Sequence, residues 1–154
     1  MKKAWFVLLV CLISYGCIKP IKVAPAASEI LKFSLNGNTV IAEYITPAGR
    51  ISFEKFNYSV VDKNEKLMFT FLPLEYDLER KIIYGSAFVT ATGAKYRKKF
   101  VIAKGETAGN ELKVTFPSGT KFFIEKKVPV PPFNYVDMLK IRLPYSFEEI
   151  QWLE

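Results

Sequence analysis

Residues 32–45, with the sequence KFSLNGNTVIAEYI, contain two short apolar runs separated by a turn signal. The runs are Lys32–Leu35 and Thr39–Ile45, and Asn36, Gly37 and Asn38 lie between them. An Asn-Gly pair accepts the positive φ angles that a tight turn needs. This stretch therefore predicts a β-hairpin, and the same pattern continues along the chain.

Further short apolar runs follow, each bounded by turn residues. We expect strands over 51–61, 67–72, 82–92, 95–103, 111–116, 121–128 and 136–143. Gly93-Ala94 and Pro117-Ser118-Gly119 are predicted to be turns between neighbouring strands. The run at 51–61 changes phase near Lys55, which predicts a bulge there. The run at 67–72 is apolar on both faces, as is typical of a central strand.

These runs predict an all-β protein. We expect an antiparallel β-sandwich of about eight to nine strands, with a small β-barrel as the alternative. A helix is predicted only near the end of the chain, over 147–153. Ser146 and Glu149 have the spacing of a capping box at its start.

The first seventeen residues have the three-part pattern of an export signal. Lys2 and Lys3 are basic, Ala4–Ile13 is an unbroken apolar run, and Gly16 precedes Cys17. The apolar run is too short for a transmembrane helix, which needs about 20 apolar residues. The pattern therefore predicts a cleaved signal peptide.

This arrangement resembles the signal peptide of bacterial lipoprotein precursors, in which a cysteine follows a small residue at the cleavage site. The resemblance implies that Cys17 is the lipid attachment site, with a diacylglyceryl thioether on its sulfur and an acyl group such as palmitate on its amine. Ile18, rather than Asp, follows it; the resemblance then favours the outer membrane, facing the periplasm, over the inner membrane or the cell surface. An ordinary cleaved signal peptide with a chance cysteine is the alternative.

The chain divides into three predicted parts. Residues 1–16 are the signal peptide, and residues 17–29 are the lipid anchor and a tether. Pro20 and Pro25 among small residues indicate that the tether is semi-extended. Residues 30–154 have the length of a single β domain.

Composition excludes several classes of enzyme. The chain has no histidine, which excludes Ser-His-Asp and Cys-His catalysis and most zinc and copper sites. Removal of the signal peptide leaves Cys17 as the one cysteine, so no internal disulfide can form. No phosphate-binding loop or nucleophile elbow is recognisable. We therefore expect no catalytic residue, no metal site and no cofactor.

Charge suggests one candidate contact surface. The full chain has 22 Lys and Arg residues against 15 Asp and Glu, a formal net charge of +7. Lys95, Arg97 and Lys99 alternate along one predicted strand and so share a face. They are candidates for contact with an anionic surface such as lipid headgroups or an envelope polymer. A solvated face or a lysine-protected edge strand is the alternative.

Three other features have a structural explanation beside a functional one. Glu75, Asp77 and Glu79 alternate as Ca²⁺ ligands can, but no loop residues follow to surround an ion, so a polar connection is favoured. Residues 128–133, VPVPPF, predict a polyproline-like connector or docking strip. The 13 Phe, 8 Tyr and 2 Trp side chains can fill a core or line a cavity.

The sequence thus predicts a lipid-anchored cell-envelope protein whose non-catalytic β domain is a scaffold or accessory subunit for another envelope macromolecule. That partner is a protein or polymer, in addition to the membrane, and export argues against nucleic acid. One alternative is a carrier for a lipid or another apolar ligand. A second alternative is an enzyme without histidine or cysteine chemistry.

Overall fold

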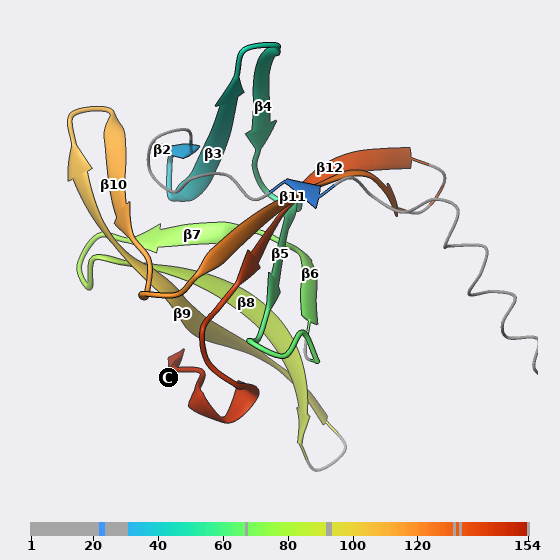
Figure 1. The fold of residues 1–154 in the computed structure, drawn as a ribbon. Helices are drawn as coiled ribbons and strands as arrows, with labels where there is room; N and C mark the ends of the chain where they lie inside the picture. The colour runs from blue at the N-terminus through green and yellow to red at the C-terminus, as the bar shows by residue number, and fades with distance from the viewer. Residues whose placement is uncertain are drawn as a thin grey trace, which may run out of the picture.

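The computed structural model describes residues 22–23, 31–66, 68–91, 94–130, 132 and 134–153. The predicted signal peptide, Cys17 and most of the predicted tether lie outside these residues. The described chain is all-β, as predicted, and its strands are β1 (Lys22–Val23), β2 (Leu31–Asn36), β3 (Thr39–Thr46), β4 (Gly49–Phe53), β5 (Tyr58–Val61), β6 (Met68–Leu72), β7 (Leu74–Asp77), β8 (Ile82–Ala91), β9 (Ala94–Ala108), β10 (Glu111–Thr115), β11 (Lys121–Val130), β12 (Asn134–Arg142) and β13 (Trp152–Leu153) (Figure 1).

Six strands close into an antiparallel barrel in the order β2-β3-β7-β8-β9-β10. β10 closes the barrel because it pairs with β9 on one side and with β2 on the other. β3 and β7 meet at the register pair Thr39 and Glu75, and the Tyr76 N–H donates to the Asn38 carbonyl at 2.8 Å. The barrel that the sequence left as an alternative is therefore present, rather than the favoured two-sheet sandwich.

A second sheet of five strands, in the order β1-β11-β12-β5-β6, lies against the barrel. Figure 1 shows β5 and β12 running side by side toward β8 and β9. β5 and β12 are parallel, so the expectation of a purely antiparallel protein is wrong for this pair. A parallel pair needs a long crossover connection, and the barrel strands between β5 and β12 supply it.

The two sheets share one hydrophobic core. Three fully buried rings come from different parts of the fold: Phe53 from the barrel's β4 extension, Tyr58 from the second sheet and Phe100 from the barrel. The Tyr58 hydroxyl lies 2.8 Å from the carbonyl oxygens of both Val40 and Phe53. Burial raises the pKa of Tyr58 far above its ordinary value, so the hydroxyl remains a hydrogen-bond donor. This single side chain thereby connects β5 to β3 and β4.

The predicted strand over 51–61 is two strands that belong to different sheets. β4 pairs with β3, whereas β5 pairs with β6 and β12. Between them Lys55 has a φ of 53°, in the left-handed region. The phase change near Lys55 was therefore located correctly, but it marks a change of sheet and not a bulge within one strand.

The predicted central strand over 67–72 is an edge strand, β6. Its bulge places Leu72 opposite Tyr58 and Thr70 opposite Ser59, so Phe71 is the extra residue, with a φ of 59°. Phe69 and Leu72 both face the core as a result. The bulge turns Phe71 outward, which explains why this run has apolar residues on both faces. The run is not a central strand with a partner on each side, as its composition predicted.

Glycine turns explain which hairpins form. The hairpins β2–β3 and β8–β9 are present as predicted. In the second of these Ala94 belongs to β9 rather than to the predicted Gly93-Ala94 turn, and Gly93 lies outside the described residues. The turn at Pro117-Ser118-Gly119 also forms, but it leads from β10 in the barrel to β11 in the second sheet. The hairpin that the sequence interpretation missed is β9–β10. Its turn, Gly109-Asn110, repeats the Gly37-Asn38 turn, with φ values of 65° and 66° at the two glycines.

The helix predicted over 147–153 is wrong. Residues Phe147–Glu149 form one turn of 3₁₀ helix, and β13 follows it. The capping contact is present, since the Ser146 N–H donates to Glu149 Oε1 at 2.8 Å. A seven-residue helix is marginal, and Trp152 instead pairs with Phe100 of β9. Within the described residues no helix is long and apolar enough to cross a membrane.

Candidate functional surfaces

The three predicted contact residues all lie in β9, in the ribbon that β8 and β9 form beyond the barrel (Figure 1). The side chains of Arg97 and Lys99 are exposed. Lys95 pairs with Thr90 in the same ribbon, and its side chain is outside the described part of the structure. Whether these residues contact an anionic surface remains a prediction.

Aromatic rings accompany these cations. Phe88 is 72% exposed and lies directly opposite Arg97 on the neighbouring strand. Lys99 Nζ lies 4.9 Å from the centre of the Tyr84 ring, within the range of a cation–π contact. We call these four residues, Tyr84, Phe88, Arg97 and Lys99, the cationic face.

The carboxylate of Glu75, next to the cationic face, already accepts a hydrogen bond. The Tyr84 hydroxyl donates to Glu75 Oε1 at 2.7 Å. Burial, together with this hydrogen bond, raises the pKa of Tyr84 to about 12. Asp77 instead accepts the Arg80 N–H at 3.0 Å and forms a turn. The described residues contain no group of three or more His, Cys, Asp or Glu side chains that could hold a metal ion.

The cationic face lies at the edge of its sheet, which also supports the alternative interpretation that its lysine and arginine protect an open edge. β13 pairs with β9 only at Phe100 and Lys99. From Ala94 to Lys98, the described strands that pair with β9 are limited to β8. Lysine and arginine at such an open edge hinder sheet-to-sheet association. Protection of the edge does not account for an exposed phenylalanine beside the cations.

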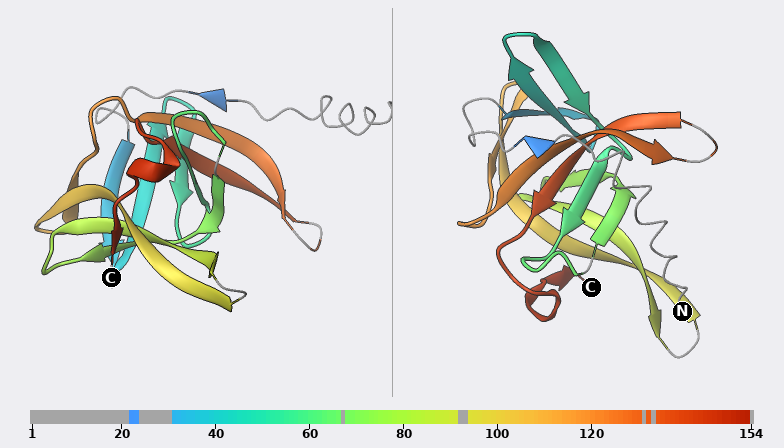
Figure 2. Two further views of the ribbon diagram at one scale, coloured as in Figure 1. Left: turned by 90° about the horizontal axis from the view of Figure 1, so that it is seen from below. Right: turned by 45° about the vertical axis from the view of Figure 1, so that its right-hand side comes forward.

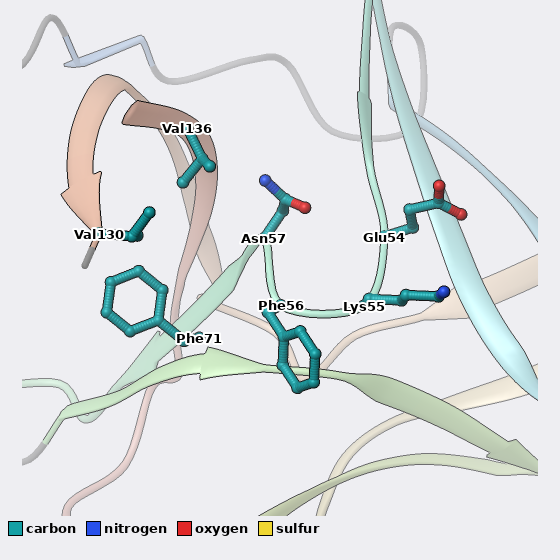
Figure 3. A pocket seen from close by; sticks show the side chains of 7 residues that line it. All are labelled: Glu54, Lys55, Phe56, Asn57, Phe71, Val130 and Val136. Atoms are coloured by element: carbon teal, nitrogen blue, oxygen red, sulfur yellow. The ribbon is translucent and has the colours of Figure 1, made fainter. Parts of the chain in front are cut away.

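A second surface was not predicted as a site. It is a groove of about 500 Å³ lined by Glu54, Lys55, Phe56, Asn57, Phe71, Val130 and Val136. Figure 3 shows the rings of Phe56 and Phe71 on one side of the groove, with Val130 and Val136 beyond Phe71. Phe56 is 61% exposed and Phe71 is 37% exposed. We call it the aromatic groove.

The backbone that forms the aromatic groove is held in an unfavourable conformation. Lys55 and Phe71 both have left-handed φ values, which cost roughly 1–2 kcal/mol for a residue other than glycine. Hydrogen bonds keep the 54–57 turn in place, since Asn57 Nδ2 donates to the Asp137 carbonyl and the Leu139 N–H donates to the Asn57 carbonyl, both at 3.0 Å. Such strain is common at functional surfaces.

The VPVPPF segment contributes to this groove, although not as the predicted polyproline connector. Residues 128–130 belong to β11 and pair with β12, with Pro129 opposite Tyr135. Pro129 is tolerated because the side of β11 that faces away from β12 has no described partner strand at this residue. The short strand β1 pairs with that side farther back, at Ile124 and Glu125. Pro131 and Phe133 lie outside the described residues.

A polar cluster covers the outer face of the second sheet. Lys140 is only 3% exposed, and its Nζ lies 2.8 Å from Glu65 Oε1 and 3.9 Å from Glu125 Oε2. Arg142 reaches the other oxygen of Glu65 at 2.8 Å. Ser59, beside Lys140 in register, is buried and its hydroxyl has no partner. Because Lys140 Nζ is bonded to Glu65 rather than to Ser59, the pair lacks the hydrogen bond of a nucleophile and its base.

Comparison of the chain with family models, with curated proteins and with solved structures finds no match. The function must therefore be inferred from this chain's own surfaces. Two of them present aromatic rings to solvent: the cationic face on β8 and β9, and the aromatic groove at the end of β11 and β12.

Proposed function

We propose that this is a lipid-anchored cell-envelope protein whose β domain is a non-catalytic scaffold or accessory subunit for another envelope macromolecule. The observation that carries the proposal is the cationic face, where exposed Phe88 lies beside the exposed cations Arg97 and Lys99. Arginine and aromatic side chains are enriched in protein interfaces. Their charge selects a partner with an anionic surface.

The anchor part of the proposal is supported by residues 1–17. The basic start, the apolar run and the Gly16-Cys17 pair resemble a lipoprotein signal. Acyl chains on Cys17 would hold the domain at a membrane, and the outer membrane facing the periplasm is favoured by Ile18. Two or more chains are needed for stable attachment, since one chain binds only weakly.

The alternative of an internal lipid carrier has less support. The barrel interior is filled by the fully buried side chains of Val40, Leu74, Ile83, Phe100 and Ile102. A Cβ placed on Gly85 would lie 2.8 Å from Leu72 Cδ1, which indicates how closely the barrel and second sheet pack. A ligand inside the barrel would have to displace this packing.

The partner is tested by affinity capture of the full chain from native membranes. We expect a stoichiometric partner that is released by salt, because exposed charges are screened. The double variant Arg97→Glu/Lys99→Glu should lose it. The control is Lys113→Glu/Lys121→Glu, which makes the same change of charge at exposed positions on β10 and β11. Equal recovery with both double variants, or no stoichiometric partner, would contradict the proposal.

The anchor is tested separately with Cys17→Ser. We expect the variant to lose palmitate labelling and to leave the membrane fraction. Unchanged labelling and fractionation would show that Cys17 is not the attachment site.

A further inference from the structure

The direction of β1 shows where the chain before it approaches the domain. Lys22 lies opposite Glu125 and Val23 opposite Ile124, and the two strands are antiparallel. The chain therefore enters β1 from the Val130 end of β11, which lines the aromatic groove. Cys17 precedes Lys22 by five residues, which span at most about 17 Å when fully extended. An anchor on Cys17 therefore lies within this reach of Lys22, and the chain that leads to it leaves β1 on the groove side.

Exposed aromatic side chains gather at this same end. Phe56 and Phe71 line the groove, and Tyr135, which is 65% exposed, lies on β12 next to Val136. Tyrosine is enriched at the interface between a bilayer and water, and phenylalanine is common on the apolar face of segments that lie in this interface. Phe56 and Phe71 thus expose apolar surface in the groove, and Tyr135 adds an exposed ring at the same end of the hairpin, on the opposite face of β12 from Val136.

The charges around the groove complement an anionic membrane. Lys55 and Glu54 both line the groove and offset each other, so the net positive charge comes from Lys126 and Lys127, which lie on β11 between the groove and the position opposite Lys22. The nearby Asp137 carboxylate already accepts the Lys127 N–H at 3.2 Å. Lys19 and Lys22 add two cations to the segment that follows Cys17. Basic residues near a lipid anchor strengthen the attraction to anionic lipid.

We infer that the aromatic groove, together with Tyr135, is the membrane-facing end of the domain and enters the headgroup region of a bilayer that contains anionic phospholipid. This inference rests on the proposed lipid anchor. The cationic face is then left for the macromolecular partner. Figure 2 shows the β11–β12 hairpin and the β8–β9 ribbon ending at separate places on the molecule.

The orientation is tested by tryptophan fluorescence of the processed full chain in vesicles of phosphatidylethanolamine and phosphatidylglycerol. The vesicles carry lipids brominated near the top of the acyl chains, which quench a ring at the depth of about 5–10 Å reached by interfacial side chains. We expect Phe56→Trp and Tyr135→Trp to lose most of the added fluorescence. The control Phe88→Trp, at an equally exposed position on β8, should keep it. Lys126→Glu/Lys127→Glu should weaken the quenching of Phe56→Trp.

Palmitate labelling of the same samples separates the two proposals. Labelled protein in which Phe56→Trp and Tyr135→Trp are not quenched would overturn the orientation and leave the anchor intact. Equal quenching of all three tryptophan variants would also overturn it, because no particular end would face the lipid. Absence of label on Cys17 would overturn the anchor and the orientation together. The tryptophan of Phe56→Trp could also be shielded from a water-soluble quencher in native membranes but not in vesicles. That result would mean that a protein covers the groove, and would contradict a lipid occupant.

Discussion

The hydroxyl of Tyr58 links the two sheets through hydrogen bonds. It is fully buried and lies within hydrogen-bond distance of the Val40 and Phe53 carbonyls. We expect Tyr58→Phe to lower the free energy of unfolding by about 1–2 kcal/mol, because the two buried carbonyls that share its single hydroxyl hydrogen lose their donor. Urea denaturation followed by circular dichroism measures this. Tyr135→Phe, at an exposed tyrosine, should change stability by less than about 0.5 kcal/mol; equal effects would mean that the Tyr58 hydroxyl is not used.

Glu65 gives the protein a predictable acid sensitivity. The hydrogen bond from Lys140, followed by the nearby charges of Lys140 and Arg142, lowers the pKa of Glu65. A carboxyl with a lowered pKa in the folded state stabilises the fold above its unfolded pKa, and this stabilisation is lost as the pH falls. Stability should therefore decline below about pH 4.5. Protonation of Glu65 also leaves the Lys140 ammonium buried, with Glu125 at 3.9 Å as its remaining carboxylate partner among the described residues.

The variant Glu65→Gln removes this sensitivity. We expect it to cost about 1–3 kcal/mol at neutral pH, less than the loss of a fully buried pair, because the Glu65 side chain is 32% exposed. Its stability should then vary less with pH below about 4.5 than that of the wild type. Unfolding curves at several pH values test both statements. Glu111→Gln, at an exposed carboxyl, should leave the acid dependence as it is.

Among the strands, Gly85 determines how closely β8 approaches β6. An added Cβ would lie 2.8 Å from Leu72 Cδ1 and 3.2 Å from atoms of Phe100 and Ile102. We expect Gly85→Ala to destabilise the fold by about 1 kcal/mol through overpacking, the low end of the usual range, because the closest atom is the terminal methyl of the Leu72 side chain, which can shift. The cost should be smaller in a Leu72→Ala background, where the closest atom is missing. A double-mutant cycle measures this coupling; additive effects would show that β6 does not pack against Gly85.

The sequence could predict elements but not their assignment to sheets. Period-two alternation and glycine turns are local, so the hairpin at Gly37 and the irregularity at Lys55 were found correctly. Strand pairing is not local, and nothing near Lys55 shows that β4 and β5 join different sheets. The same reason explains why Arg97 and Lys99 could be recognised as one face of a strand. The aromatic groove could not, because it combines side chains from the 54–57 turn, Phe71, Val130 and Val136.

The barrel and the second sheet should unfold together as one cooperative unit. One cluster of buried side chains includes Tyr58, Ile141 and Phe100, from β5, β12 and β9. Hydrogen exchange in increasing denaturant should therefore bring the amides of these three strands to one common opening free energy, because they share a cooperative core. The short strand β1 should exchange at much lower cost.

The contrary result has a definite structural meaning. If β5 and β12 open while β8 and β9 remain protected, the second sheet is a separate layer on a self-sufficient barrel. The Tyr58 contacts to Val40 and Phe53 argue against this, because opening β5 would break hydrogen bonds to two barrel-side strands at once. Tyr58→Phe is the discriminating variant. It should lower the common opening free energy of all three strands equally if they unfold as one unit, and only that of β5 and β12 if they do not.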